Sequence, residues 1–427
     1  MVENMSAQLL EKAILQIDRD RLIKLVMDLV DIPSPTGFEG DVARAVHEVL
    51  GEANFDSVLQ PIGDDRYNAV GRWQGQGGGK SLMFNGHLDT SFGPEQAHRG
   101  LGYQCKATLV DDEWIYGMGT FNMKSAMATY IVACESIQKA GIKLKGDVVI
   151  AAVAGEIEKA PVNEHEGPQY QGYGVGTKFA ITHGAIADMC ILGEPTNMIA
   201  INQHCGTCWV KITVPGHLIH TAWSDVEKNA INKSRKVLDA IHEWIPGYCE
   251  RNQLDDGFPI RVNVSAVEAG WSWRGARTPD NCIIYMDVRT QPDKFPLEAY
   301  NEVRDMISSV VNLNPELEGT KVETVVTAPG TSIPKDHVLM QTIQKAHNEQ
   351  LGKPVEIGTE VWMSDAAHMN RYGIPPVNYG SAGRIRTGGG GFSTHQGEAV
   401  HIGDMLDIVK VYIQCIMQIC GVFAEDE

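Results

Sequence analysis

The chain has 427 residues, nine cysteines and a formal net charge of −18. This length favours two domains, and the acidic balance argues against nucleic acid or an anionic membrane as partner, because both attract clustered lysine and arginine. No apolar run reaches the roughly 18 residues of a transmembrane helix, and the N-terminal segment lacks a signal-peptide pattern, so we expect a cytoplasmic protein. Cys205 and Cys208 have redox-like spacing, but we expect ordinary buried thiols.

The first half of the chain alternates helices with short apolar strands. Helical periodicity covers residues 6–30, about 40–50 and 125–141. Apolar runs predict buried strands at residues 80–90, 146–156 and 187–196. We therefore predict an α/β domain, with a mostly parallel sheet and helices on both faces.

The pattern changes between residues 205 and 332. Alternating strands and two helices follow one another there in the order β-α-β-β-α-β, which is typical of a small α+β domain with helices on one face. The α/β pattern then resumes, with helices predicted over 337–352 and 405–423. One domain, of residues 1–204 and 333–427, is thus predicted to be interrupted by an inserted domain of residues 205–332.

Polar side chains follow the predicted strands of the first domain. His87 and Asp89, in GHLDT, suit a metal-ligand histidine with an orienting acid beside it. Asn122 stands in GMGTFNMK, Glu156 in GEIEK and Glu194 in GEPT. The carboxyl ends of parallel strands are where α/β sheets place ligands, so we expect a site at this edge.

These motifs carry a resemblance to a known family. GHLDT, GMGTFNMK, AGEIE, GEPT, GHLIHTAWSDVEKNAI, MDVR, SDAA and THQGE occur in the order of the M20 metallopeptidase family. The resemblance covers nearly the whole chain. It implies a catalytic metal-binding domain interrupted by a dimerisation or lid domain, and hence a homodimer or a higher homo-oligomer.

The resemblance also implies a ligand set, in which the chain departs from the family. In such enzymes two cations share a bridging aspartate, which falls on Asn122 here. One cation takes the residues at His87 and Glu194, and the general base falls on Glu156. The remaining ligands of the second cation fall on Ile157 and on a C-terminal histidine, here His395.

An amide cannot compensate the repulsion of two dications, and isoleucine cannot bind metal. We therefore expect one labile divalent metal, Mn, Zn or Co, held by His87, Asn122 and Glu194. The alternative is that Glu158 or His395 recruits a second ion.

Substrate contacts are predicted from the same resemblance. His220 matches a lid histidine that stabilises the oxyanion. Arg384 and Arg386 flank the glycine-rich loop and could bind a carboxylate together with His395. Arg289 is a further carboxylate contact, although an ion pair with Asp287 is an equally good reading.

The sequence therefore predicts a metal-dependent hydrolase that cleaves a C–N bond of a carboxylate-bearing small molecule through a metal-activated water. The altered metal set favours hydrolytic deamination of an aminobenzoate such as 5-nitroanthranilate. Trp223, Trp271 and Trp273 could offer flat walls for the ring, or could be lid core or dimer surface. Two alternatives stay open: a two-metal N-acyl-amino-acid deacylase or peptidase, and a catalytically inactive binding relative.

Overall fold

The computed structural model describes residues 2–254, 257, 259–381 and 397–423. The chain divides into two compact units. The first contains residues 1–202, 333–358 and 364–427, and the second contains residues 203–332 and 359–363. The second unit thus extends beyond the predicted insertion by Gln203 and His204 and by the separate segment 359–363.

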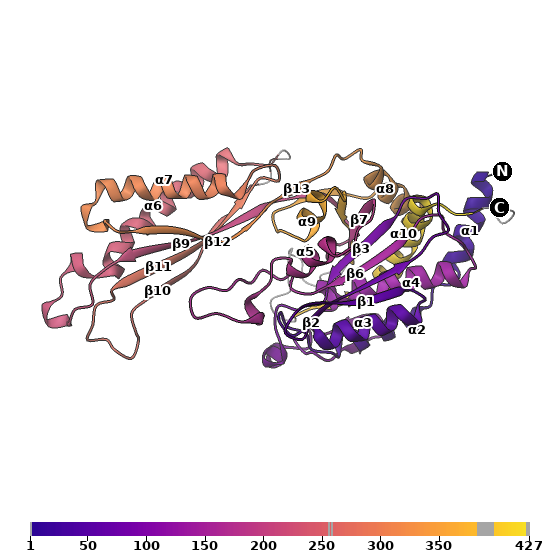
Figure 1. Cartoon of the computed structure of the whole chain (residues 1–427), viewed down its shortest axis with the longest axis horizontal. Helices are drawn as coiled ribbons and strands as arrows, with labels where there is room; N and C mark the ends of the chain where they lie inside the picture. The colour runs from indigo at the N-terminus through magenta and orange to yellow at the C-terminus, as the bar shows by residue number, and fades with distance from the viewer. Residues whose placement is uncertain (1, 255–256, 258, 382–396, 424–427) are drawn as a thin grey trace. The chain divides into compact units, whose positions relative to one another are not determined.

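The first unit is built on a mixed sheet (Figure 1). Its strands follow the order β1 (Asp56–Gly63), β2 (Arg66–Trp73), β6 (Val148–Val153), β3 (Leu82–His87), β7 (Met189–Leu192), β15 (Pro376–Asn378) and β8 (Ala200–His204). Strands β6, β3, β7 and β15 are parallel, whereas β1, β2 and β8 pair antiparallel to their neighbours. The mostly parallel character predicted for this sheet is confirmed for its central strands.

Helices cover both faces of this sheet, as predicted. One face packs against α1 (Val2–Ile14), α2 (Arg19–Val30), α3 (Gly40–Glu52), α4 (Ser125–Lys139), α8 (Val338–Leu351) and α10 (Ile402–Cys420). The other packs against α5 (Val175–Thr182) and α9 (Ala366–Arg371). Successive residues of β3 alternate between the two cores, Leu82 and Phe84 on the first and Met83 on the second. A strand buried on both faces explains its continuous apolar run.

The segment predicted as one helix over 6–30 forms two. Helix α1 ends at Ile14 and α2 begins at Arg19. The side chain of Asp18 accepts the backbone N–H of Arg21 at 2.9 Å, and this cap stabilises a new helix start. Amphipathic periodicity continues across the break, which is why the pattern alone does not reveal it.

Further strands pair at the margins of the sheets. Strands β4 (Thr108–Val110), β5 (Trp114–Tyr116) and β16 (Ala399–His401) form a small sheet in the order β16-β5-β4. Strands β13 (Thr331–Ser332) and β14 (Ile357–Glu360) pair with β8. The sequence patterns did not predict the β1–β2 hairpin or this three-stranded sheet.

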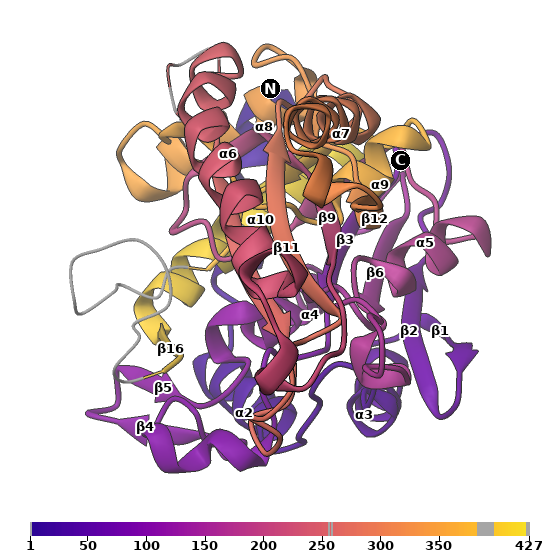
Figure 2. The ribbon, with the colours of Figure 1, turned by 90° about the vertical axis from the view of Figure 1, so that its left-hand side faces the viewer.

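The second unit has the predicted β-α-β-β-α-β order. Its antiparallel sheet runs β10 (Val262–Ala269), β11 (Asn281–Thr290), β9 (Gly206–Pro215) and β12 (Lys321–Ala328). Helices α6 (Ala230–Arg251) and α7 (Pro296–Leu313) lie side by side over one face (Figures 1 and 2). Every second residue of β9, from Cys208 to Val214, is buried in the core between the sheet and these helices.

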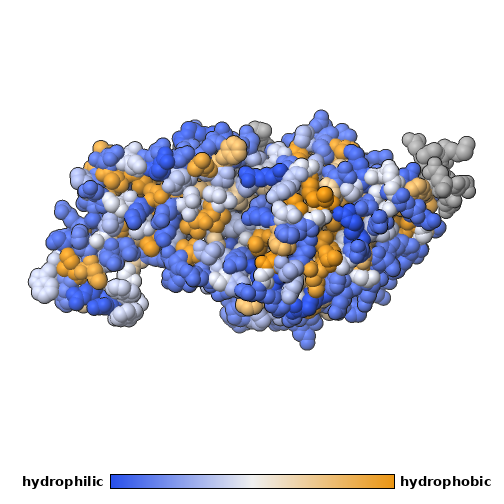
Figure 3. Space-filling view, in the orientation of Figure 1, coloured by the Kyte–Doolittle hydropathy of each residue, from blue (hydrophilic) through white to orange (hydrophobic). Residues whose placement is uncertain are grey.

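Hydrophilic residues cover much of the face seen in Figure 3, with apolar residues in small patches between them. In the described part of the chain, no helix is long and apolar enough to cross a membrane. The nine cysteines, all among the described residues, form no disulfide, and Cys205 and Cys208 are both buried.

Candidate metal centre

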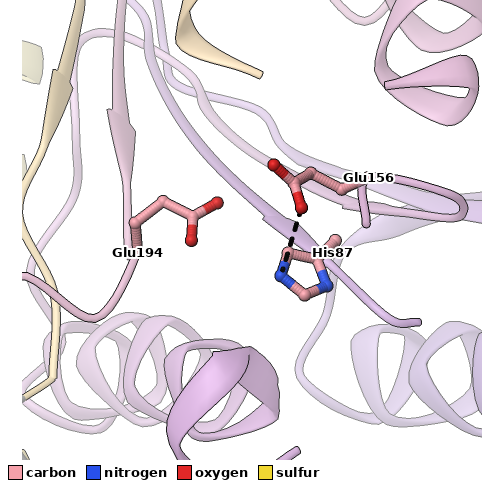
Figure 4. Close-up of side chains that lie close together, drawn as sticks. All are labelled: His87, Glu156 and Glu194. Atoms are coloured by element: carbon pink, nitrogen blue, oxygen red, sulfur yellow. Dashed lines mark ion pairs between the residues drawn. The ribbon is translucent and has the colours of Figure 1, made fainter. Parts of the chain in front are cut away.

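Three strand ends bring a histidine and two glutamates together. His87 is the last residue of β3, whereas Glu156 and Glu194 follow the ends of β6 and β7. These strands are parallel neighbours, so their carboxyl ends lie at one edge of the sheet. One ligand atom from each of the three buried residues lies within 4.8 Å of the others. Figure 4 shows the three side chains converging.

The imidazole of His87 has a defined orientation. Its Nδ1 lies 2.8 Å from the backbone oxygen of Asp89, so this ring nitrogen carries the proton and donates it. Its Nε2 faces the cluster, 2.9 Å from the side-chain oxygen of Asn122 and 3.8 Å from an oxygen of Glu156. Nε2 is therefore the ring nitrogen that faces the oxygen atoms of the cluster, and a neutral ring would present its lone pair there to a cation, which is the arrangement of a metal-binding histidine.

Asp89 contacts His87 more closely through its backbone oxygen than through its carboxylate, and its predicted role as the acid that orients the ring stays a prediction. The carboxylate oxygen is 3.5 Å from Nδ1, beyond the carbonyl contact. The carboxylate instead accepts the backbone N–H of Glu156 at 2.9 Å and of Ile157 at 3.2 Å, and the hydroxyl of Thr36 at 2.8 Å. Asp89 thus positions the segment that carries Glu156.

Burial dominates the electrostatics of this cluster. It raises the pKa of Glu194 to about 7 and that of Glu156 well above its usual value, and repulsion between carboxylates adds to both shifts. Burial alone lowers the pKa of His87, but Asp89 and the charges of Glu156 and Glu194 outweigh it and raise the pKa overall. Buried carboxylates beside an imidazole favour a positive charge between them, so this donor set fits a divalent cation.

Asp365 adds negative charge beside the cluster, although it was not among the predicted site residues. It precedes α9 and is buried, and the hydroxyl of Thr177 donates to its Oδ2 at 2.6 Å. Its Oδ1 has no hydrogen-bond partner. Burial raises the pKa of Asp365 to about 6. Asp365 belongs to the SDAA motif of the family resemblance, but no pattern in the neighbouring residues marks it as part of a metal site.

The segment after β6 is where the resemblance implies a ligand for a second cation. Ile157 offers no ligand atom, and Glu158 is exposed. Among the described residues, His87, Glu156 and Glu194 form the one cluster of three or more histidine, cysteine or acidic donors at metal-binding distances. Glu156 therefore belongs to the cluster together with the predicted ligands.

The described structure does not test the predicted substrate contacts. Arg384, Arg386 and His395 lie outside the described residues. His220 belongs to the second unit, where its Nδ1 accepts the N–H of Ala222 at 3.1 Å. Arg289, on β11, forms the alternative ion pair with Asp287 at 2.8 Å. Their roles toward substrate stay predictions.

Three tryptophans of the second unit are exposed within this chain. Trp223 is 74% exposed, Trp273 is 76% exposed and Trp271 is 43% exposed. They are therefore not buried lid core within this chain. Their predicted place as walls for an aromatic ring is not tested by these exposures.

The first unit has a mostly parallel sheet with a histidine and two glutamates at its carboxyl edge, and its chain is interrupted by an α+β unit. These features define the class of two-unit metallohydrolases. The family model described as Peptidase family M20/M25/M40 matches residues 83–418. The chain belongs to this family, as the motifs indicated. It is a metal-dependent hydrolase that acts on C–N bonds.

Several relatives and solved structures resemble the chain over most of its length. It is 23% identical to N-formyl-4-amino-5-aminomethyl-2-methylpyrimidine deformylase of Halalkalibacterium halodurans, over 96% of this chain and 97% of that protein. It is 24% identical to succinyl-diaminopimelate desuccinylase of Gluconacetobacter diazotrophicus, over 93% and 97%. A tripeptidase from Staphylococcus aureus has a similar fold, with a TM-score of 0.71, 18% identity, and 95% and 99% of the two chains covered.

Proposed function

We propose that this chain hydrolyses an amide C–N bond next to a carboxylate in a small molecule, as an N-acyl-amino-acid deacylase or a peptidase. The observation that carries the proposal is the buried cluster of His87, Glu156 and Glu194 at the edge of the sheet. The names of the relatives support an amide substrate, since a deformylase and a desuccinylase each remove an acyl group from nitrogen. This was the alternative reading of the sequence.

A divalent cation at this cluster would supply Lewis acidity toward a substrate oxygen and lower the pKa of water. His87 and Glu194 would hold it, with the carbonyl oxygen of Asn122 as a neutral third donor. Glu156 has the raised pKa of a group that can accept a proton from water and deliver it to the leaving nitrogen. Asp89 fixes the backbone of Glu156 during this transfer.

We further propose that the chain holds one labile ion. Asn122 and Ile157 stand where the family implies anionic ligands, and the site therefore lacks the anionic bridge that would offset the repulsion between two adjacent dications. Metal titration followed by elemental analysis tests this. We expect one ion per chain, and we expect Asn122→Asp to bind that ion more tightly or to recruit a second. Two tightly held ions in the unaltered chain would show that the single-ion proposal is wrong.

Deamination of an aminobenzoate is the second candidate function. The replaced ligands, Asn122 and Ile157, are the observation that favours unusual chemistry. The comparisons give no support to an aromatic substrate, and for this reason the amide reading comes first. Parallel assays separate the two: amine release from N-succinyl, N-formyl and dipeptide substrates against ammonia release from 5-nitroanthranilate. Ammonia release alone would reverse the order of the two candidates.

We infer that the first unit is the catalytic domain and that the second acts as a dimerisation or lid domain. The resemblance to the family supports this division, with His220 and Arg289 as contacts to the substrate and Arg384 and Arg386 as carboxylate ligands. Light scattering on the purified chain tests the oligomer. A monomer at all concentrations would contradict the dimerisation role.

A further inference from the structure

The side chain of Glu398 reaches the loop that carries Asn122. Glu398 is 4% exposed, and its Oε2 accepts the backbone N–H groups of Gly119, Phe121 and Asn122 at 3.0, 3.1 and 2.9 Å. Three amide donors around one carboxylate oxygen form an anion-binding nest, which compensates the buried charge without a cation. The partners are 276 to 279 residues apart in the chain, so only tertiary structure creates this contact.

The backbone of Glu398 is itself held in place. Its N–H donates to the carbonyl of Gly102 at 3.0 Å, and its carbonyl accepts the N–H of Gly117 at 3.3 Å. The next residue begins β16, which pairs with β5. Gly397 has a φ of +73°, and a Cβ there would lie 2.4 Å from the carbonyl carbon of Gly102, so the turn requires glycine. The backbone of Glu398 is therefore fixed in position, and its carboxylate can hold the loop.

Asn122 depends on such support more than a carboxylate ligand would. Its contact with the cluster is a single neutral oxygen, 2.9 Å from Nε2 of His87. A carboxylate ligand attracts a cation through its charge over a wide range of distances and angles. A neutral carbonyl oxygen binds the cation well only at the right distance and angle. The position of the Asn122 backbone consequently decides whether this oxygen reaches the cluster.

We propose that Glu398 is a positioning residue for the metal centre, acting through the backbone of Asn122. This inference rests on the proposed metal-dependent function. Loss of an outer partner of a metal ligand typically costs about 10- to 100-fold in metal affinity or activity. The contacts of Glu398 place it in that class, because it touches the ligand loop and none of the donors His87, Glu156 and Glu194.

The first experiment compares Glu398→Gln with the unaltered enzyme, each loaded with Co²⁺ or Mn²⁺. We expect the metal dissociation constant to rise by about 10-fold and the visible absorption of the Co²⁺ form to change. Asp147→Asn is the matched control, because Asp147 also accepts a loop N–H, that of Gly75, but lies just before the amino end of β6. The control should leave both readouts unchanged.

The second experiment asks whether Glu398 acts through Asn122. In an Asn122→Ala background, Glu398→Gln should add less than about a twofold change in metal affinity, since coupled residues are not additive. The same change in both backgrounds would overturn the inference. If Glu398→Gln does not fold, Glu398→Asp replaces it, since the shorter side chain keeps the charge but cannot reach the nest.

Different results would contradict the proposed function and the positioning role of Glu398. If the unaltered chain binds no divalent ion, the proposed metal-dependent function is wrong. If it binds the ion and Glu398→Gln binds it equally well with the same spectrum, only the positioning role of Glu398 is wrong.

Discussion

The carboxylate of Asp89 accepts the backbone N–H of Glu156 at 2.9 Å. The two residues follow different strands, β3 and β6, so this hydrogen bond joins two strand ends across the candidate metal centre. A second bond, from the N–H of Ile157 at 3.2 Å, fixes the same turn. The acid beside the histidine thus determines where the proposed base stands.

Asp89→Asn should impair catalysis and stability together. An amide keeps one acceptor oxygen, so one of the buried donors that Asp89 now binds would face an N–H₂ group. We expect about a 10- to 100-fold loss in kcat and about 1–3 kcal/mol less stability. Initial rates and urea unfolding measure the two effects. Asp188→Asn is the control, since Asp188 binds the N–H of Ser81 at an exposed site. An unchanged kcat would contradict the positioning role.

Glu156→Gln should abolish proton transfer while keeping the shape of the site. We expect kcat to fall by about 100-fold or more, with one metal ion still bound, since His87, Asn122 and Glu194 remain. Rates and metal content, measured on the same sample, test this. Loss of the metal would show that Glu156 is a ligand. Unchanged hydrolysis would exclude it as the base.

If the unaltered chain hydrolyses nothing and Glu156→Gln binds ligands as before, the inactive-relative reading becomes the better one. A binding protein has no need of a base at this position.

Arg66→Met should destabilise the first unit. Arg66 donates two hydrogen bonds of 2.8 Å to Glu39, and both side chains are buried. Removing one partner leaves an uncompensated buried carboxylate, which typically costs about 3–5 kcal/mol. Urea unfolding should show a smaller loss for the double variant Arg66→Met/Glu39→Met. Arg44→Met, at an exposed ion pair, should change stability far less.

The pH dependence of stability should include a contribution from His204. Burial lowers its pKa from 6.5 to about 4. As the pH falls below 6.5, the unfolded chain therefore binds this proton before the folded chain does. The stability that the neutral imidazole contributes above pH 6.5 is lost progressively toward pH 4. Between pH 7.5 and pH 5, linkage gives a loss of about 2 kcal/mol from this residue.

His204→Phe keeps an aromatic ring against Trp362 and removes the titration. Urea unfolding at the two pH values should show a smaller loss for the variant than for the unaltered chain. Equal losses would mean that His204 does not titrate between the folded and unfolded states in this range.

The candidate site was predictable as far as strand ends are visible in the sequence. Apolar runs marked β3, β6 and β7, and His87, Glu156 and Glu194 lie at or shortly after their carboxyl ends, so the parallel-sheet rule placed these side chains together. The β1–β2 hairpin was missed because β1 is largely exposed and shows no apolar run. The break before Arg19 was missed because amphipathic periodicity continues across it. The residues 382–396, which include Arg384, Arg386 and His395, lie outside the described part of the chain, and their predicted roles stay predictions.

The sequence by itself determined the order of elements, the interruption of one unit by another, and the donor residues that the strands deliver to one edge. These features depend on hydrophobic periodicity and on short motifs, which are local properties of the chain. Only the tertiary structure decided that Asp89 holds the turn of Glu156, that Asp365 adds a buried charge, and that Glu398 holds the Asn122 loop. Such contacts join residues far apart in the chain, and packing of the whole unit, rather than any local pattern, brings their atoms within hydrogen-bonding distance.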